Sequence, residues 1–105
     1  AEVAYRRALA IVPGHAGALN NLAVLLAGQG RAAEAEACWR EALAAHPDDG
    51  ACLYNFGSHL ADSERLDEAL GLLRRAALAW PAHASVRNNL ARLLELKGRA
   101  DEAER

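Results

Sequence analysis

The chain has 105 residues, a formal net charge of −2 and 25% charged residues. This balance is not that of a protein that binds nucleic acid through an excess of basic residues, nor that of a disordered charged tail. The longest purely apolar run, Leu22–Ala27, is too short to cross a bilayer, so we expect no membrane-bound segment.

Three prolines recur along the chain at a constant interval. Pro13, Pro47 and Pro81 are evenly spaced, and each is expected to close a helix because its ring cannot donate the next backbone hydrogen bond. Apolar residues recur at three- and four-residue steps, which is the pattern of an amphipathic helix, and Gly30 and Gly98 are helix-stop signals. We therefore expect helices over residues 1–12, 16–29, 32–46, 50–63, 66–80, 84–97 and from about 100 to the end, and no strand.

The same residue types return at the same places in each segment. A fixed period of about 34 residues indicates one supersecondary unit that is used several times. We expect a single domain, residues 1–105, made of the second half of a repeat (1–15), two full repeats (16–49 and 50–83) and an incomplete repeat (84–105). The recurring residues are Leu19, Leu22, Ala23, Leu26, Ala35, Trp39 and Ala42 in the first full repeat, and Leu53, Phe56, Gly57, Leu60, Ala69, Leu73 and Ala76 in the second.

This pattern resembles the tetratricopeptide repeat, in which large apolar, small and aromatic residues and a proline return at these spacings. The resemblance covers the whole chain. It implies an all-α fold, an α-solenoid of helix–turn–helix repeats that forms a right-handed superhelix. The departures are local: Arg87 stands at a large apolar position, Leu73 at an aromatic one, and Glu64 where a glycine marks the turn between helices.

Motifs that carry chemistry are nearly absent. No phosphate-binding glycine loop, paired metal-binding histidines or nucleophile elbow can be found. We therefore expect no catalytic residue, no metal and no cofactor, and any catalytic domain would lie outside this chain. The separation of Cys38 and Cys52 is neither a metal-ligand nor a redox spacing, so we interpret both as reduced, buried apolar residues rather than as a disulfide.

Two side chains with aromatic rings, His59 and Trp80, are expected to pack against neighbouring helices or helix ends. His59 falls inside a helix and is expected to pack there with one ring nitrogen satisfied. Trp80 precedes Pro81 at a place that is usually polar in these repeats. It either folds over the helix end as local core or is exposed as an anchor for a partner.

The resemblance implies that function lies in a surface. In the family, the first helix of each unit lines a concave groove. Asn21, Asn55 and Asn89 stand at the same place of that helix in successive repeats, and they resemble the asparagine ladder in the repeat superhelix of O-linked N-acetylglucosamine transferases. An amide can pair with a peptide backbone as donor and acceptor; alternatively, it bonds a neighbouring helix and orders the groove. The expected groove residues are Asn20, Asn21, Tyr54, Asn55, Ser58, Asn88, Asn89 and Arg92.

Three classes of function follow. The first is an interaction scaffold that binds an extended segment of a protein or peptide partner in the groove. The second is a substrate-recruiting fragment of a larger enzyme, such as a glycosyltransferase of that kind. The third is a structural scaffold that self-associates head to tail through complementary apolar stripes at the two chain ends. A clamp for C-terminal carboxylates is not expected, because its cations would fall on Asn20, Ser85 and Asn89. No signal peptide is visible, and a cytoplasmic location is expected.

Overall fold

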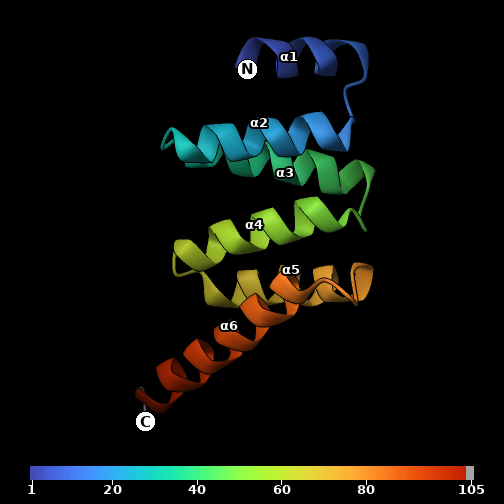
Figure 1. The fold of residues 1–105 in the computed structure, drawn as a ribbon. Coiled ribbons are helices and arrows are strands. Elements are labelled where there is room, and N and C mark those ends of the chain that lie inside the picture. Colours follow the sequence, from blue (N-terminus) through green and yellow to red (C-terminus); the bar gives the residue numbers. More distant parts are fainter. Residues whose placement is uncertain (104–105) are drawn as a thin grey trace.

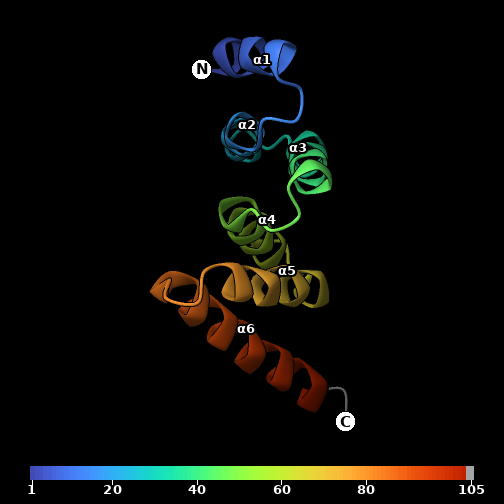
Figure 2. The same ribbon diagram turned by 90° about the vertical axis from the view of Figure 1, so that its right-hand side faces the viewer.

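The computed structural model of the chain describes residues 1–103, which form six helices and no strand. The helices are α1 (Glu2–Ile11), α2 (Ala16–Gly28), α3 (Ala32–Ala45), α4 (Gly50–Asp62), α5 (Leu66–Ala79) and α6 (Ala84–Ala103). They stack in chain order along the long axis of a molecule that measures 51 × 29 × 20 Å (Figure 1). α2 and α4 lie on one side of the stack and α3 lies on the other (Figure 2). The all-α helical repeat expected from the sequence is confirmed.

The first helices of the two full repeats begin at side-chain caps. The Nδ1 atom of His15 accepts a hydrogen bond of 3.0 Å from the backbone N–H of Ala18 at the start of α2. Asp49 does the same for Cys52 at the start of α4, also at 3.0 Å. Each cap satisfies a backbone donor that the helix itself leaves unpaired.

The turns inside the two full repeats both use the left-handed backbone conformation. Gly30 has a φ of 78° and Glu64, at the same place in the next repeat, has a φ of 60°. A glycine adopts this conformation without a steric penalty, whereas a residue with a Cβ is strained in it. The sequence departure at Glu64 therefore changes the residue but not the shape of the turn.

The core lies between the helices of neighbouring repeats and consists of small and large apolar residues in alternation. The indole of Trp39 stacks on the ring of Phe56 with centroids 5.4 Å apart. Gly57 lies so close to α5 that a Cβ there would meet Cγ of Leu73 at 2.9 Å. The residues of the recurring frame are buried as expected, including Leu19, Leu22, Ala23, Leu26, Ala35, Ala42, Leu53, Leu60, Ala69 and Ala76.

An ion pair near each inner turn ties one repeat to the next. Arg65, just before α5, donates hydrogen bonds of 2.8 and 2.9 Å to the two carboxylate oxygens of Glu36 on α3. Arg31, just before α3, donates one of 3.0 Å to Glu2 on α1. Each pair spans 29 residues of sequence. The Glu36 side chain is only 10% exposed, so the Arg65–Glu36 pair is the more shielded from solvent.

The expected helix break near Gly98 is wrong, because α6 continues through this residue to Ala103. A glycine inside a helix costs only about 1 kcal/mol relative to alanine. Two ion pairs between residues four apart bridge the position, Arg99 with Glu95 at 2.6 Å and Lys97 with Asp101 at 3.3 Å. Both pairs favour the continuous helix. The list of expected helices therefore shortens by one, and the last two residues of the expected seventh helix, Glu104 and Arg105, lie outside the described residues.

The sequence also explains why this turn differs from the other two. Leu70 on α5 stands one repeat period after Glu36, and Arg99 stands one period after Arg65. In the preceding repeats a glutamate at this position pairs with the arginine of the turn. Here the position is occupied by Leu70, which is 6% exposed and cannot form an ion pair. Arg99 pairs within its own helix instead.

The two cysteines differ in burial, because Cys52 is buried as expected whereas Cys38 is only half-buried. Cys38 and Cys52 are both free thiols, and burial raises the pKa of Cys52 to about 12, which makes it unreactive near neutral pH. None of the helices within residues 1–103 is both long and apolar enough to cross a bilayer.

Candidate functional site

The expected groove residues all lie on the first helices of the repeats, α2, α4 and α6. The exposed ones are Asn21, Asn88 and Arg92, and the half-buried ones are Tyr54, Asn55, Ser58 and Asn89. Asn20 differs from the rest, because it is buried with 8% of its surface exposed. The expectation that Asn20 faces a ligand does not match this burial.

Asn20 is instead the centre of a hydrogen-bond network that links three helices. Its Oδ1 atom accepts the indole N–H of Trp39 on α3 at 2.9 Å and an amide N–H of Asn55 on α4 at 3.1 Å. Because an indole nitrogen can only donate, the acceptor must be the oxygen of Asn20 and not its nitrogen. The same oxygen then fixes the orientation of Asn55, whose Nδ2 points to α2 and whose Oδ1 is turned away from it.

The next repeat has an equivalent hydrogen bond, in which a tyrosine replaces the accepting asparagine. Asn89 on α6 donates its amide N–H to the hydroxyl oxygen of Tyr54 at 3.1 Å, again across 35 residues of sequence. Tyr54 therefore accepts a hydrogen bond from Asn89 in the same way that Asn20 accepts one from Asn55. The second and third members of the asparagine series each use one amide N–H to bond the neighbouring helix, which leaves a second N–H and the carbonyl oxygen of each amide for other partners.

A hollow of about 380 Å³ lies between α2 and α4. It brings together two of the expected groove residues, Asn55 and Ser58, with Val24 of α2. The other residues that line it are Ala27, Trp39, His59 and Asp62. The hollow is therefore apolar on its α2 side and polar on its α4 side.

The polar side of this hollow contains an unsatisfied hydroxyl group. The Oγ atom of Ser58 is buried and has no hydrogen-bond partner within residues 1–103. A buried polar group without a partner costs about 1–3 kcal/mol. Beside it, His59 bonds Glu36 through Nε2 at 3.1 Å, as the prediction of one satisfied ring nitrogen requires.

Electrostatics decide the proton positions in the His59–Glu36 pair. Burial raises the pKa of the Glu36 carboxyl, but hydrogen bonds from Arg65 and His59 lower it more, and the resulting pKa lies below its ordinary value. Glu36 is therefore a carboxylate at neutral pH and only accepts hydrogen bonds. His59 must donate through Nε2, which in the neutral ring leaves Nδ1 as an acceptor.

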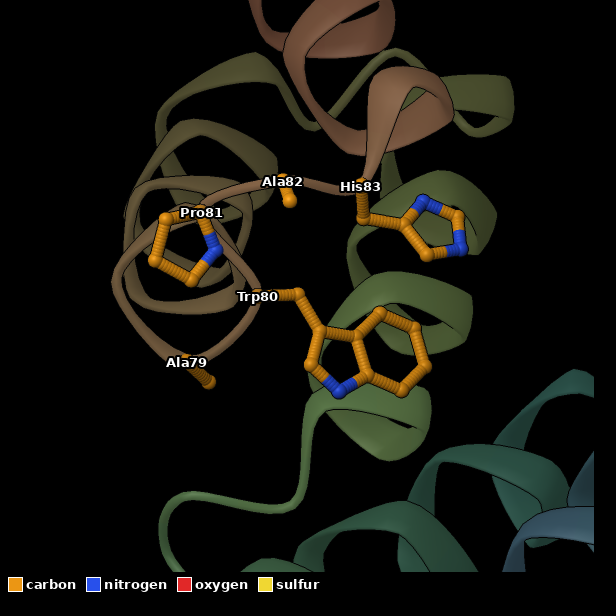
Figure 3. A pocket seen from close by; sticks show the side chains of 5 residues that line it. All are labelled: Ala79, Trp80, Pro81, Ala82 and His83. Atoms are coloured by element: carbon orange, nitrogen blue, oxygen red, sulfur yellow. The ribbon is translucent and has the colours of Figure 1, made fainter.

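A second hollow, of about 450 Å³, lies at the turn between α5 and α6. Figure 3 shows the rings of Trp80 and His83 pointing toward α4, and the two rings stack with centroids 4.7 Å apart. The indole lies against the first turn of α4, where a Cβ on Gly50 would meet it at 2.5 Å. Trp80 therefore folds over the helix end as local core, which was the first of its two interpretations.

Four residues that line the α2–α4 hollow have no groove role in the sequence-based prediction, namely Ala27, Trp39, His59 and Asp62. A signal existed for Asp62, because it follows Ser58 by four residues and thus lies on the same helix face. His59 and Trp39 had been assigned to packing alone.

Comparison with known protein families decides the class of the chain. Family models described as tetratricopeptide repeats match residues 1–55 and residues 54–105. The chain belongs to the tetratricopeptide repeat family. Tetratricopeptide repeats are non-catalytic modules that generally mediate protein–protein interaction, which agrees with the interaction scaffold expected from the sequence.

Solved structures support the same fold. A chain in the structure of Naa15/Naa10 bound to HypK-THB superposes on this tetratricopeptide array with a TM-score of 0.79 and 27% identity over 86% of the array. The match spans only 14% of that chain. No curated protein matches the sequence.

Proposed function

We propose that the face formed by α2, α4 and α6 binds an extended segment of a partner protein. The observation that carries this proposal is the repeated amide geometry on that face. Asn55 and Asn89 are each oriented by a hydrogen bond to the preceding repeat, and each keeps polar atoms that this bond does not use. A side chain held in place loses little conformational entropy when it binds a ligand.

The spacing of the repeats suits an extended backbone. Packed helices lie about 8–10 Å apart, and an extended chain rises about 3.3 Å per residue. One amide per repeat therefore meets about every third residue of the bound segment. Exposed Asn21 and Arg92 extend the same surface at its two ends.

Architecture supports a protein as the partner. The solved chain that this array resembles comes from a complex of several proteins, Naa15/Naa10 with HypK-THB. Recruitment of substrates to an enzyme is the alternative use of the same surface. In that case the bound segment has the same binding face but belongs to a substrate, which a catalytic domain outside this chain then modifies.

Selection of short random peptides on the 105-residue chain, followed by fluorescence anisotropy with the selected peptide, tests the proposal. Asn21→Ala and Arg92→Ala should each weaken binding about two- to tenfold, as expected for a lost hydrogen bond worth about 0.5–1.5 kcal/mol. Glu41→Ala on α3 and Arg74→Ala on α5, both exposed residues of second helices, serve as controls. Binding that the controls reduce and the two test variants do not would contradict the proposal.

A further inference from the structure

The α4 wall of the hollow between α2 and α4 is rich in hydrogen-bond acceptors. Asn55 gives one N–H of its Nδ2 to Asn20, which leaves its carbonyl oxygen as an acceptor and its second N–H as a donor. His59 gives Nε2 to Glu36, so its remaining ring nitrogen accepts in the neutral form. The unpaired hydroxyl of Ser58 is buried behind the surface of the wall and becomes available to a ligand through a change of rotamer, and the carboxylate of Asp62 completes the wall. A ligand that satisfies this wall must supply several donors.

The charge of the hollow is also one-sided. Asp62 makes no ion pair within residues 1–103, whereas Glu36 behind the wall is neutralised by Arg65. Asp62 is moreover the last residue of α4. There the helix dipole is negative, so a carboxylate is unfavourable for the helix and a cation is favoured. Both effects attract a positively charged group to this end of the hollow.

The opposite wall is apolar and the space fits a long side chain. Val24 and Ala27 on α2 offer apolar surface above the buried Trp39, and Val24 is 49% exposed. A volume of about 380 Å³ is at the lower end of the range for ligand pockets, about 300–1,000 Å³. An apolar stem with a cationic head matches these two walls, and this is the form of arginine and lysine.

We infer that this hollow takes a basic side chain, arginine in first place, from the extended segment that binds the face. This inference rests on the proposed function and specifies the partner's chemistry. Arginine is favoured over lysine because its planar fork of donors meets several acceptors at once. The acceptors on α4 hold the guanidinium, and the α2 wall covers the methylene stem.

The next repeat junction does not reproduce this site. Arg92 stands one repeat period after Ser58, and Leu96 stands one period after Asp62, both on α6. The corresponding place between α4 and α6 is therefore cationic and apolar rather than acidic. Of these two junctions, the one between α2 and α4 alone has the acidic wall that accepts the basic side chain, so this side chain fixes the register of the bound segment.

Amide chemical shifts of the 105-residue chain test the inference directly. The probes are N-acetyl-arginine methylamide and its neutral isostere, N-acetyl-citrulline methylamide, each titrated at millimolar concentration. The arginine probe should shift the signals of residues 24–27 and 55–62 in a saturable way, and the citrulline probe should not. Equal shifts from the two probes, or none from the arginine probe, would overturn the inference.

Two substitutions sharpen the result. Asp62→Asn should weaken arginine binding about three- to tenfold, the range of a partly shielded ion pair, without lowering the melting temperature. Ser58→Ala should also weaken it while leaving the melting temperature equal or higher, because an unpaired hydroxyl is removed. Asp48→Asn, at an exposed acid in the α3–α4 turn, should change neither quantity. Unchanged arginine binding in Asp62→Asn would contradict the inference.

The selected peptide separates this inference from the proposed function. If the peptide binds the face but is insensitive to Asp62→Asn and to replacement of its arginine by citrulline, only the basic-side-chain inference fails. If no selected peptide depends on Asn21 or Arg92, the proposed function fails, whatever the arginine probe does in the hollow.

Discussion

Asn20 of α2 and Asn55 of α4 are joined by a side-chain hydrogen bond of 3.1 Å between adjacent repeats. The acceptor oxygen also receives the indole N–H of Trp39 at 2.9 Å, so two donors depend on one atom. This bond explains how a polar residue comes to lie in the core and how the amide of Asn55 is oriented for a ligand.

Replacement of Asn20 should destabilise the array. Asn20→Ala leaves the buried indole N–H of Trp39 and the half-buried amide of Asn55 without their acceptor, and an unsatisfied buried donor costs about 1–3 kcal/mol. Asn20→Asp keeps an oxygen at the same place and should recover part of the loss. Urea unfolding followed by circular dichroism measures both variants. Equal stability of Asn20→Ala and the wild type would show that the network does not stabilise the fold.

The Glu36–Arg65 pair should make stability depend on acid pH. The pKa of Glu36 is lower in the folded state than in the unfolded state, where it is about 4.3. Its contribution is therefore complete above that value and is lost as the pH falls through the lower, folded-state pKa. At pH 7, Glu36→Gln should lose about 1.5–3 kcal/mol, the range for hydrogen bonds to a charged group.

The comparison that checks this prediction is the difference between wild type and Glu36→Gln at neutral and at strongly acid pH. We expect the difference to shrink as the pH falls, since the wild-type carboxylate then becomes protonated. Glu41→Gln, at an exposed site on the same helix, should show little difference at either pH. A gap between wild type and Glu36→Gln that is the same at both pH values would rule out the ion pair as its cause.

Glu64 should be a site where a glycine stabilises the protein. The strain of its left-handed backbone, φ 60°, is about 1–2 kcal/mol. A glycine removes this strain, but its greater conformational entropy in the unfolded state lowers the stability by about 0.4–1 kcal/mol. Glu64→Gly should therefore raise the melting temperature slightly. Gly30→Ala, at the same place one repeat earlier, should lower it, whereas Gly28→Ala inside α2 should not. A lower melting temperature in Glu64→Gly would mean that the strain is not relieved.

Gly50 and Trp80 should be energetically coupled. A Cβ on residue 50 would meet the indole at 2.5 Å, so Gly50→Ala must displace the ring and should cost about 1–3 kcal/mol, the usual range for overpacking. In a background of Trp80→Ala the same substitution should cost much less. Urea unfolding of the two single variants and the double variant gives the coupling energy. Strict additivity of the two effects would exclude direct contact.

The sequence predicts the fold well because the repeat is periodic in the residues that pack. Leu22, Ala35 and Trp39 lie in the core as their spacing requires, and the helix ends fall close to the prolines. The continuation of α6 through Gly98 could not be predicted, because Gly98 stands where a stop signal is expected but a glycine alone does not end a helix. At each of the two preceding turns, the arginine just before the second helix of the repeat pairs with a glutamate of the preceding repeat. At the third such place the glutamate position is occupied by Leu70, so Arg99 has no such partner there.

The candidate site was harder to predict, because its details depend on side-chain orientation. Asn20 and Asn21 are equivalent by residue type, yet one is buried and the other is exposed. Adjacent residues of a helix point in different directions, and Asn20 is the one that points to the Trp39 indole in the core. The hollow beside Asp62 likewise depends on the separation of α2 and α4, which no single-residue pattern encodes.

The ion pairs between repeats did have a readable signal in the sequence. Glu2 and Glu36 stand at the same place of successive repeats, and so do Arg31 and Arg65. The prediction of the helices rests on the spacing of the apolar residues alone, so it does not include this recurrence of charged residues.

The central claim, that the first-helix face binds an extended segment, is tested most directly by mapping a selected peptide on the amide chemical shifts of the 105-residue chain. We predict that the largest shifts fall in α2, α4 and α6, at Asn21, Asn55, Asn89 and their neighbours on the same face. The second helices, represented by Glu41 and Arg74, should change little. A peptide that shifts α3 and α5 and leaves α2, α4 and α6 unchanged would contradict the account.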